Sequence, residues 1–398
     1  MNILETASVV QSAVAQSIGA EYMSVDTTDL AALESYKIAD VGTAVLDSGS
    51  VEPFTKALLG VLGKMVIDEK KYKGELPSLF YDNFEWGSYV ERVYFAPQDV
   101  MSDSMWNLVN GQSYDDHVFY KPNVTAKIYE EAKPIVTPIS ITEEQLKIGF
   151  ENWSQLSSYL GGIKTNVANT LELAMQCYAF MLLDCGIAVA HEGTGNKYDL
   201  KTMAVADGVD GVTAADTPAQ LFENEKFMIY ALRKIASIRR YMARYSTAFN
   251  NGAIPTFTTE EESRAALLTD FVNATKFNVR ANTFNKDEIG IGKYDEVSCW
   301  QAFKDTNEGV VTKFDFATNS SVEIAADPNN KLGLGTSAIT LTNVIGVLYD
   351  HRAMGICPYK TMVTSSYTAR GNFYNEYHHV LANYILDSNF PIIVFTLN

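Results

Sequence analysis

The chain has 398 residues, of which 47% are hydrophobic and 20% charged, so it is a globular protein with room for more than one domain and not a disordered or fibrous one. Lys and Arg number 31 against 48 Asp and Glu, and the net charge of −17 argues against tight binding of nucleic acid over the whole surface, because such a surface repels phosphate. No uninterrupted apolar run reaches about 18 residues, and no Lys or Arg precedes Lys37, so we expect no membrane span, no secretory signal and synthesis in the cytoplasm.

The N-terminal part of the chain is predicted to be an arm that carries helices. An amphipathic helix is expected from about residue 4 to residue 18, followed by an irregular arm. A second helix is expected over 52–67, where Pro53 stands near the first position and a basic run before Gly74 follows the end.

Two predicted strands, 87–95 and 124–129, enclose a long connection with little regular pattern. In the second strand Val124, Ala126 and Ile128 alternate with other residues. A connection of this length is uncommon inside a compact domain and usually has a function, and an isolated two-stranded hairpin is marginally stable in water. We therefore expect a protruding hairpin that needs a surface to lie on, and a neighbouring subunit is the natural candidate.

The longest predicted element is a helix in the middle of the chain. It follows a return strand over 134–141 and a short helix that begins at Thr142. Apolar residues then recur every three or four positions over a length of about 50 Å, and no Pro interrupts them. The face predicted to be buried carries Leu156, Leu160, Ile163, Val167, Leu171, Ala174, Tyr178, Met181, Cys185 and Val189.

The second half of the chain is predicted to mix helices and strands. A helix is expected to begin at Thr217, with Pro at its first position and Gln at its third, and to run to about Tyr245. Another helical stretch is expected from Thr259. The remaining predicted elements are strands over 310–316, 321–324 and 339–348, a helix-like segment, and an apolar run over 391–397 suited to the centre of a sheet.

The sequence lacks the patterns of common catalytic and metal sites. Its five His and four Cys show no metal-binding spacing, and HExxH, GxSxG, Walker-type and GxGxxG motifs are absent. We therefore predict no cofactor and no enzymatic activity, which favours a binding or structural role. One basic group stands out in the acidic chain and is interpreted first as a solvated helix face, second as an interface or a nucleic-acid-facing patch: Arg233, Lys234, Arg239, Arg240 and Arg244.

Several segments carry a resemblance to a known family. They are Pro122–Thr125 with 150–160, then Arg233–Ala236, Phe249–Asn250, 271–274 and 281–285, and finally 347–353, 361–363 and 373–380. With the order of the predicted elements, they resemble the major capsid proteins of tailed bacteriophages with the Hong Kong 97-type fold. The likeness is greatest to coat proteins of small short-tailed phages of the phi29 type, and it covers most of residues 40–398.

The resemblance implies an α+β protein of the Hong Kong 97 type. Its parts would be an N-terminal arm and helix over 1–74, an extended hairpin (the E-loop) over 75–138, a peripheral domain with a long spine helix over 139–192, an axial domain over 193–344 and the closing part of the peripheral domain over 345–398. The implied function is a structural capsid protein that self-assembles into pentamers and hexamers of an icosahedral head around double-stranded DNA. A scaffolding protein and a portal protein are implied partners, DNA is enclosed without sequence-specific binding, and no membrane is involved. The implied location is the virion, after synthesis in the cytoplasm of a bacterial host.

Five charged residues of the hairpin are predicted to set its register on a neighbouring subunit, although solvated strand faces explain them equally well: Glu91, Arg92, Lys127, Glu130 and Glu131. Three alternatives to a phage coat remain open. An encapsulin-like shell would package a protein cargo instead of DNA, and a minor head or tail component would differ in copy number. A soluble enzyme without a recognisable motif would remain a monomer with a deep pocket.

Overall fold

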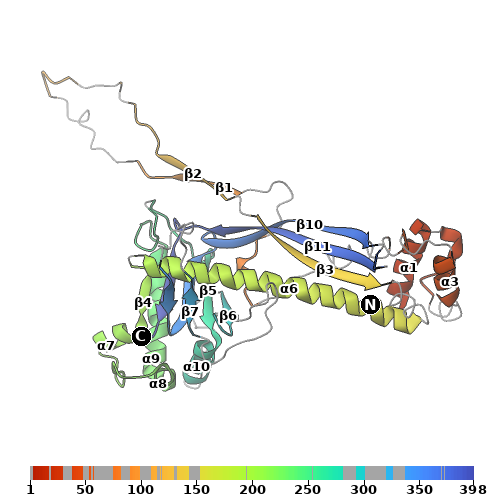
Figure 1. The fold of residues 1–398 in the computed structure, drawn as a ribbon. Helices are drawn as coiled ribbons and strands as arrows, with labels where there is room; N and C mark the ends of the chain where they lie inside the picture. The colour runs from red at the N-terminus through yellow and green to blue at the C-terminus, as the bar shows by residue number, and fades with distance from the viewer. Residues whose placement is uncertain are drawn as a thin grey trace.

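A long helix, α6 (Trp153–Glu192), runs through an elongated body and connects three groups of elements (Figure 1). N-terminal helices pack at one end of α6, a three-stranded sheet lies along its middle, and a five-stranded sheet with further helices surrounds its other end. This computed structural model describes residues 3–17, 19–29, 38–47, 53–54, 57, 75–81, 90–98, 109–113, 117, 119–129, 132–142, 153–193, 195–252, 254–280, 293–300, 320–325, 337–368, 370–371 and 373–398.

The N-terminal helices share a small core of their own with the start of α6. Helix α1 (Ile3–Ser17) confirms the first predicted helix. Helix α3 (Ile38–Asp47) lies where an irregular arm was predicted, and that prediction is wrong because Val41 and Val45, one helical turn apart, are both buried in this core. The core consists of Ala7, Val9, Val10, Ala13, Val14, Met23, Ile38, Val41, Val45, Phe54, Trp153, Leu156 and Leu160.

The sheet along the middle of α6 consists of three antiparallel strands in the order β10-β11-β3. They are β3 (Ala132–Thr142), β10 (Met354–Thr368) and β11 (Phe373–Leu386). The prediction of a helix-like segment near the C-terminus is therefore wrong, because β10 and β11 are strands. Burial in β11 alternates residue by residue over most of its length, which is the period of a strand with one face on the core.

The sheet at the other end of α6 has five strands in the order β4-β12-β9-β5-β6. The final apolar run forms β12 and is fully buried between β4 and β9, so its predicted central position is confirmed. A separate short pair joins β7 (Val322–Ile324) to β8 (Ile339–Leu341). The strands of the five-stranded sheet are β4 (Lys197–Asp199), β5 (Ser263–Leu268), β6 (Tyr294–Val297), β9 (Val344–Asp350) and β12 (Ile392–Thr396).

The predicted helix from Thr217 to Tyr245 is divided into α8 (Pro218–Glu223) and α9 (Glu225–Met242). Thr217 is the predicted N-cap, and it forms a capping box with Gln220, the third residue of α8. The break occurs at Asn224, whose side chain accepts hydrogen bonds from two backbone N–H groups in the first turn of α9. An Asn in this position starts a new helix by satisfying donors that have no partner inside the helix.

The helical stretch expected from Thr259 is also wrong. Residues 260–262 form a turn, β5 follows, and only then does α10 (Thr269–Arg280) begin. Strand β5 is buried along almost its whole length between β9 and β6, and such central strands lack the alternation that marks an exposed one. A short helix, α7 (Leu200–Ala206), follows β4.

The two sheets do not follow the predicted division of the chain. Strands β9 and β12 fall within 345–398 for nearly all of their length, yet they pair with β5 and β4 of the segment 193–344. Strand β3 passes without a break through residue 138, where the hairpin region was expected to end. The predicted strand 339–348 is divided between β8 and β9, with Asn343 at a φ of 53° in between.

Helix α6 confirms the predicted long helix, and its first half buries Leu160, Val167 and Leu171 as the spacing indicated. Met181 is 49% exposed, which corrects its place on the buried face. Helix α6 contacts β7, β10 and β12. The residues buried in this part of the helix therefore face several neighbours and do not form the single apolar stripe that was predicted. By length and composition Leu156–Glu192 could cross a membrane, but most of its apolar window is buried inside the protein, as in a core helix.

Three predicted elements lie wholly or largely outside the described residues. They are the short helix after Thr142, the strand over 310–316, and most of the helix over 52–67, of which residues 53, 54 and 57 are described as helical.

Gly186 lies where α6 passes closest to β10. A Cβ atom at this position would lie 2.1 Å from Sδ of the fully buried Met354. We expect Gly186→Ala to lower the free energy of unfolding by about 1–3 kcal/mol through overpacking, although Ala is the better helix former. Urea denaturation of the unassembled subunit measures this change.

Gly162 is the matched control, because it lies in the same helix, is exposed, and has no neighbouring atom within 4 Å of the place that a Cβ atom would occupy. Gly162→Ala should raise the free energy of unfolding by up to about 1 kcal/mol. Adding Met354→Ala to Gly186→Ala should recover part of the loss. If both alanine variants were stabilised equally, the close contact at Gly186 would be ruled out.

Two titratable side chains are buried on the face of β11 that looks toward α6. Glu376 and His378 are 1% and 3% exposed, and they share that face with Tyr374, which packs with Ile163 of α6. Glu376 Oε1 lies 3.4 Å from His378 Nε2. Burial raises the pKa of Glu376 to about 8 and lowers the pKa of His378, so both side chains are uncharged at pH 7.

A carboxyl that keeps its proton in the folded chain but loses it in the unfolded chain makes folding less favourable as the pH rises from about 4.5 to about 8. Gln is neutral throughout this range. We therefore expect the free energy of unfolding of Glu376→Gln to exceed that of the natural chain at pH 8 and to differ little from it at pH 4.5. Urea denaturation at both pH values measures this difference. Equal stability at pH 8 would mean that the carboxylate is charged and compensated in the fold.

Candidate assembly surface

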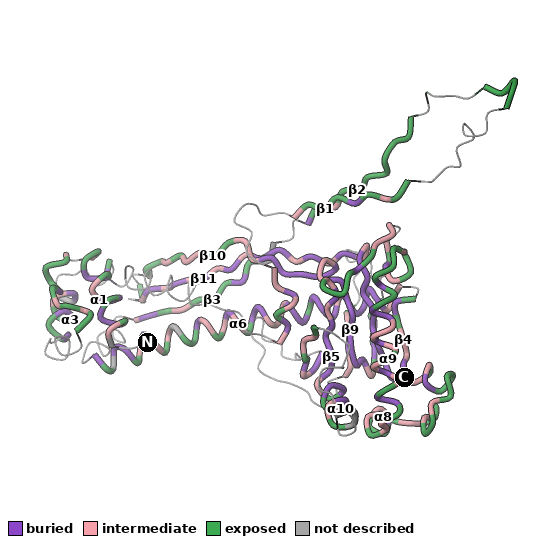
Figure 2. Tube along the Cα trace, turned by 180° about the vertical axis from the view of Figure 1, so that it is seen from behind, coloured by how far each residue is buried: buried purple, intermediate pink, exposed green. Residues whose placement is uncertain are grey.

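Strands β1 (Val90–Phe95) and β2 (Val124–Tyr129) form an antiparallel hairpin that projects from the body (Figures 1 and 2). Strand β2 has the predicted bounds, and β1 ends where predicted. No other described strand joins this sheet. Beyond the paired strands, the described parts of the connection are almost entirely exposed, and Phe119, five residues before β2, is 84% exposed. The expected protruding hairpin is therefore present.

The two faces of the hairpin have different surroundings. Successive side chains of a strand point to opposite faces, so Arg92 and Tyr94 of β1 share one face with Lys127 and Tyr129 of β2. This inward face contacts the body. The other face is exposed and, apart from Glu91, apolar. We call it the apolar hairpin face, and it carries Val93 (49% exposed), Phe95 (67%), Val124 (47%), Ala126 and Ile128 (53%).

A buried carboxylate at the end of β11 holds the inward face. The side chain of Asp387 is fully buried, and Arg92 Nη1 lies 3.2 Å from its Oδ2. The hydroxyl of Tyr94 donates to the same oxygen, and Arg92 also donates to the backbone carbonyl of Arg352. Burial, together with the hydrogen bond to Asp387, raises the pKa of Tyr94 to about 12, so the hydroxyl remains a neutral donor.

Aromatic rings surround the same guanidinium group. Arg92 Cζ lies 5.7 Å from the ring centre of Tyr129 and 5.6 Å from that of Phe390. The guanidinium of Arg352 lies over the Phe390 ring at 4.6 Å and forms an ion pair with Asp350 at 2.9 Å. Phe390 therefore contacts two guanidinium groups, and both belong to ion pairs with fully buried carboxylates.

The structure separates the five charged residues predicted to contact a neighbour. Arg92 forms an ion pair within its own subunit, and Lys127 lies on the inward face with Nζ 5.1 Å from the Tyr129 ring centre, so neither lies on the apolar hairpin face. Glu91 is exposed on the apolar hairpin face. Glu130 and Glu131 lie outside the described residues.

Sequence reasoning overlooked the residues that set these two faces apart. The alternation in β2 was recognised, and extending it to Val93 and Phe95 of β1 would have predicted the apolar hairpin face. No local pattern indicates Asp387 or Phe390, because the partners of Arg92 lie nearly 300 residues further along the chain.

The outer face of the three-stranded sheet is a second surface with few charges. Lys360 is the one residue with a formal charge among those listed below for this face, whereas 20% of the whole chain is Asp, Glu, Lys or Arg. Val136 of β3, an edge strand of this sheet, is 44% exposed. We call it the outer sheet face, and from β3, β11 and β10 in turn it carries Pro134, Val136, Pro138 and Ser140; Asn375, Tyr377, His379 and Leu381; and Lys360, Met362, Thr364 and Ser366.

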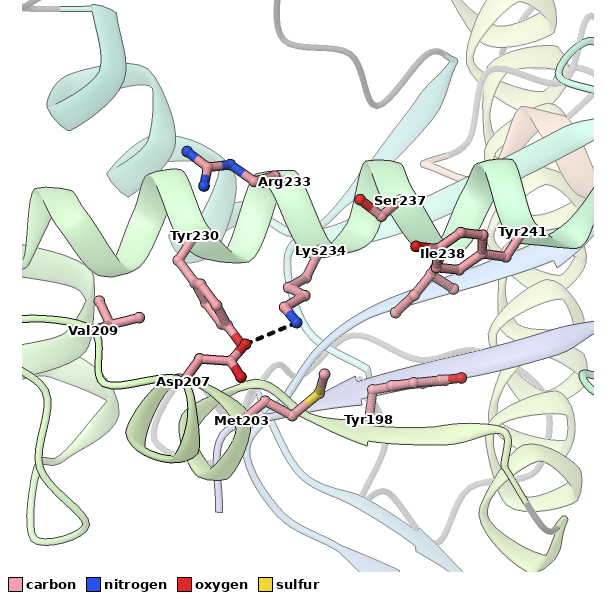
Figure 3. A pocket seen from close by; sticks show the side chains of 10 residues that line it. All are labelled: Tyr198, Met203, Asp207, Val209, Tyr230, Arg233, Lys234, Ser237, Ile238 and Tyr241. Atoms are coloured by element: carbon pink, nitrogen blue, oxygen red, sulfur yellow. Dashed lines mark hydrogen bonds and ion pairs between the residues drawn. The ribbon is translucent and has the colours of Figure 1, made fainter.

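A half-open cavity of about 570 Å³ lies between α7 and α9 (Figure 3). Within it, Asp207 accepts hydrogen bonds from Tyr230, at 2.6 Å, and from Lys234, at 2.8 Å, so these polar groups satisfy one another. Arg233 points away from this cluster in Figure 3. Of the basic group on α9, Arg239 is buried and bonded to Ser263 Oγ at 3.1 Å, so the solvated-face interpretation fails for that residue.

The described residues hold no group of three His, Cys, Asp or Glu that could bind a metal ion. The exposed surfaces that the geometry sets apart are therefore those of the hairpin and the sheet, which are suited to protein contacts.

The fold defines the class of protein. A projecting hairpin, a long helix beneath a sheet, and a second sheet with helices form the Hong Kong 97-type arrangement of phage capsid proteins, as the sequence resemblance implied. The chain belongs to the family of Phi29-like phage major capsid proteins, whose model matches residues 12–396. It is accordingly a structural protein of a phage head, located in the virion.

One solved structure supports the fold. The chain is similar to a chain in the capsid structure of Staphylococcus phage Andhra, with a TM-score of 0.52 and 11% identity over 81% of this chain and 83% of that one. It is also similar to a chain in a structure of bacteriophage P68 described as showing the head fiber and inner core protein, with a TM-score of 0.49 and 11% identity over 80% and 83% of the two chains. The chain matches none of the curated proteins.

Proposed function

We propose that copies of this chain form the pentamers and hexamers of an icosahedral head that encloses double-stranded DNA, and that the hairpin of each copy lies on the next copy. The observation that carries this proposal is the apolar hairpin face, which no described residue of its own subunit covers. A two-stranded hairpin needs a further strand or a packing surface to be stable. In a closed shell every copy supplies a hairpin and receives one, so the same contact is used throughout.

The outer sheet face is the proposed seat of the neighbouring hairpin. The hairpin face is apolar, and the outer sheet face contributes Pro134, Val136, Pro138, Met362 and Leu381 among mostly uncharged polar residues. Burying the two faces against each other stabilises the contact by about 25 cal/mol per Å² of apolar area removed from water. Each surface has one formal charge of opposite sign, Glu91 on the hairpin and Lys360 on the sheet. We retain Glu91 as the candidate that sets the register of the hairpin on the next copy, with Lys360 of that copy as its partner. Two opposite charges favour one alignment of the two faces over the others.

The parts of the subunit receive the roles that the family resemblance implies. The three-stranded sheet with α6 would be the peripheral domain, and the five-stranded sheet with α7 to α10 would be the axial domain at the capsomer centre. Because β9 and β12 pair with β4 and β5, we assign these two strands to the axial part and keep β10 and β11 in the peripheral part.

Further partners follow from the same proposal. A scaffolding protein and a portal protein would guide assembly, and synthesis would take place in the cytoplasm of the bacterial host. The net charge of −17 suits a wall that encloses DNA without binding its phosphates tightly.

Replacing apolar residues of the hairpin face should prevent assembly without unfolding the subunit. In the variant Val93→Ser/Ile128→Ser both side chains are about half exposed in the single subunit, so its free energy of unfolding should change little. The loss of apolar burial at each of many repeated contacts should reduce the yield of shells at least tenfold, counted by negative-stain microscopy after expression with the scaffolding protein.

Thr125→Ser is the matched control, because Thr125 is an exposed residue of the same hairpin on its inward side. It should assemble as the natural chain does. Normal shell yield from the Val93→Ser/Ile128→Ser variant would remove the basis of the proposed contact.

Deleting residues 97–121 removes most of the connection between β1 and β2. The body holds its cores without this segment, so we expect a folded monomer with the far-ultraviolet circular dichroism of the natural chain. We expect no shells by negative-stain microscopy, because the arm that reaches the neighbour is shortened. Shells of normal size from this deletion would refute the role of the hairpin.

A further inference from the structure

We infer that Arg92 and Asp387 are positioning residues for shell assembly, which hold the hairpin in one direction relative to the body. The inference rests on the proposed function, because the direction of the hairpin matters only if the hairpin docks on another copy. It also goes beyond that function, because it assigns the direction to a buried ion pair inside the subunit and not to contacts with the neighbour.

The ion pair lies where the chain passes between the two sheets. Residues 350–354 lead from β9 in the five-stranded sheet to β10 in the three-stranded sheet, and residues 386–392 lead back from β11 to β12. We call these two connecting segments the crossings, and backbone hydrogen bonds join them to each other. The Asp387 N–H donates to the Ala353 carbonyl at 2.7 Å, and the Asp350 N–H donates to the Pro391 carbonyl at 3.1 Å. The root of the hairpin is thus attached to the junction of both sheets.

Both crossings hold the hairpin through Arg92. On one side the guanidinium pairs with Asp387, and on the other it donates to the carbonyl of Arg352. Phe390, from the crossing after β11, contacts the guanidinium groups of both arginines. A change in the angle between the two sheets would therefore move the anchor of the hairpin as well.

The hairpin acts as a lever on this anchor. Arg92 and Tyr94 lie near the base, and the chain continues through residues 96–123 before it returns along β2. The described residues of this connection extend well beyond the paired strands in Figures 1 and 2, so a small rotation at the root produces a larger displacement at the far end. A loosened root would also tilt the apolar hairpin face, which lies on the same two strands as Arg92, away from its place on the next copy.

The chemistry of the anchor gives it rigidity. Asp387 is fully buried, so removal of its cationic partner leaves a buried charge that only hydrogen bonds compensate. The planar guanidinium can contact the Tyr129 and Phe390 rings while it pairs with the carboxylate, and a Lys ammonium cannot do all three equally well. Loss of Arg92 is therefore expected to loosen the root more than the body.

The test uses the full-length Arg92→Gln variant and two measurements. In the unassembled subunit, amide hydrogen exchange should become at least tenfold faster in 90–95 and 124–129, and remain unchanged in β10 and β11. In assembly reactions, the particles should be broken or heterogeneous in diameter by electron microscopy, at a temperature where the variant remains folded. Arg92→Lys, which keeps the charge, should give intermediate results in both measurements.

Arg370→Gln is the matched control, since Arg370 is exposed in the turn between β10 and β11, and it should leave exchange in the hairpin unchanged. Unchanged hairpin exchange in Arg92→Gln overturns the inference, and so do particles of normal, uniform diameter from a subunit with a loosened hairpin. If Arg92→Gln also speeds exchange in β10 and β11, Phe390→Leu replaces it, because that variant keeps the ion pair but removes the ring between the two arginines. Phe390→Leu should then loosen the hairpin alone, and loosening of the whole subunit would overturn the inference.

These outcomes differ from those that test the proposed function. Normal shells from the Val93→Ser/Ile128→Ser variant would contradict docking of the apolar hairpin face, whatever Arg92→Gln does to hairpin exchange. If the face variant fails to assemble while Arg92→Gln leaves hairpin exchange and particle diameter unchanged, docking stands and only the positioning role is overturned.

Discussion

A two-stranded sheet has two faces, and in this hairpin the described residues of the subunit cover only one of them. The inward face of the hairpin lies on the body, while Val93, Phe95 and Ile128 on the other face are about half exposed or more. Such apolar area is ordinarily buried by a third strand or a helix, and the described part of the body offers neither. An exposed apolar face of this kind is suited to burial against another copy, which agrees with the membership of this chain in a family of phage major capsid proteins.

At this hairpin the charged groups are buried and the apolar side chains are exposed, which is the reverse of the usual distribution in a globular protein. The side that touches the body buries an ion pair between Arg92 and Asp387, whereas the side that faces water is apolar. A buried ion pair contributes little net stability compared with apolar packing, but it is directional. Direction is what an arm needs if it has to reach a partner at a defined place, and the bonds to both crossings between the sheets supply it.

The body is arranged so that one helix connects otherwise separate cores. The start of α6 belongs to the small core of the N-terminal helices, and its later residues belong to the large core beneath both sheets. Between them, Glu376 and His378 are buried without charge where an apolar contact would be usual. The long helix thus packs against elements of every group in the elongated subunit.

The sequence by itself determined the elements whose signals are local. The apolar spacing gave α6 its position, the alternation of residues gave β2 its bounds, and Thr217 with Pro218 fixed the start of α8. The order of these elements was sufficient to suggest the capsid fold. Local signals failed where neighbours distant in sequence decide the outcome: several strands surround α6 and leave Met181 exposed, and β9 and β6 enclose β5, where a helix was expected. Only the tertiary structure showed that Arg92 belongs to its own subunit, because the buried carboxylate that binds it lies 295 residues away and no pattern within β1 reports a contact made across that distance.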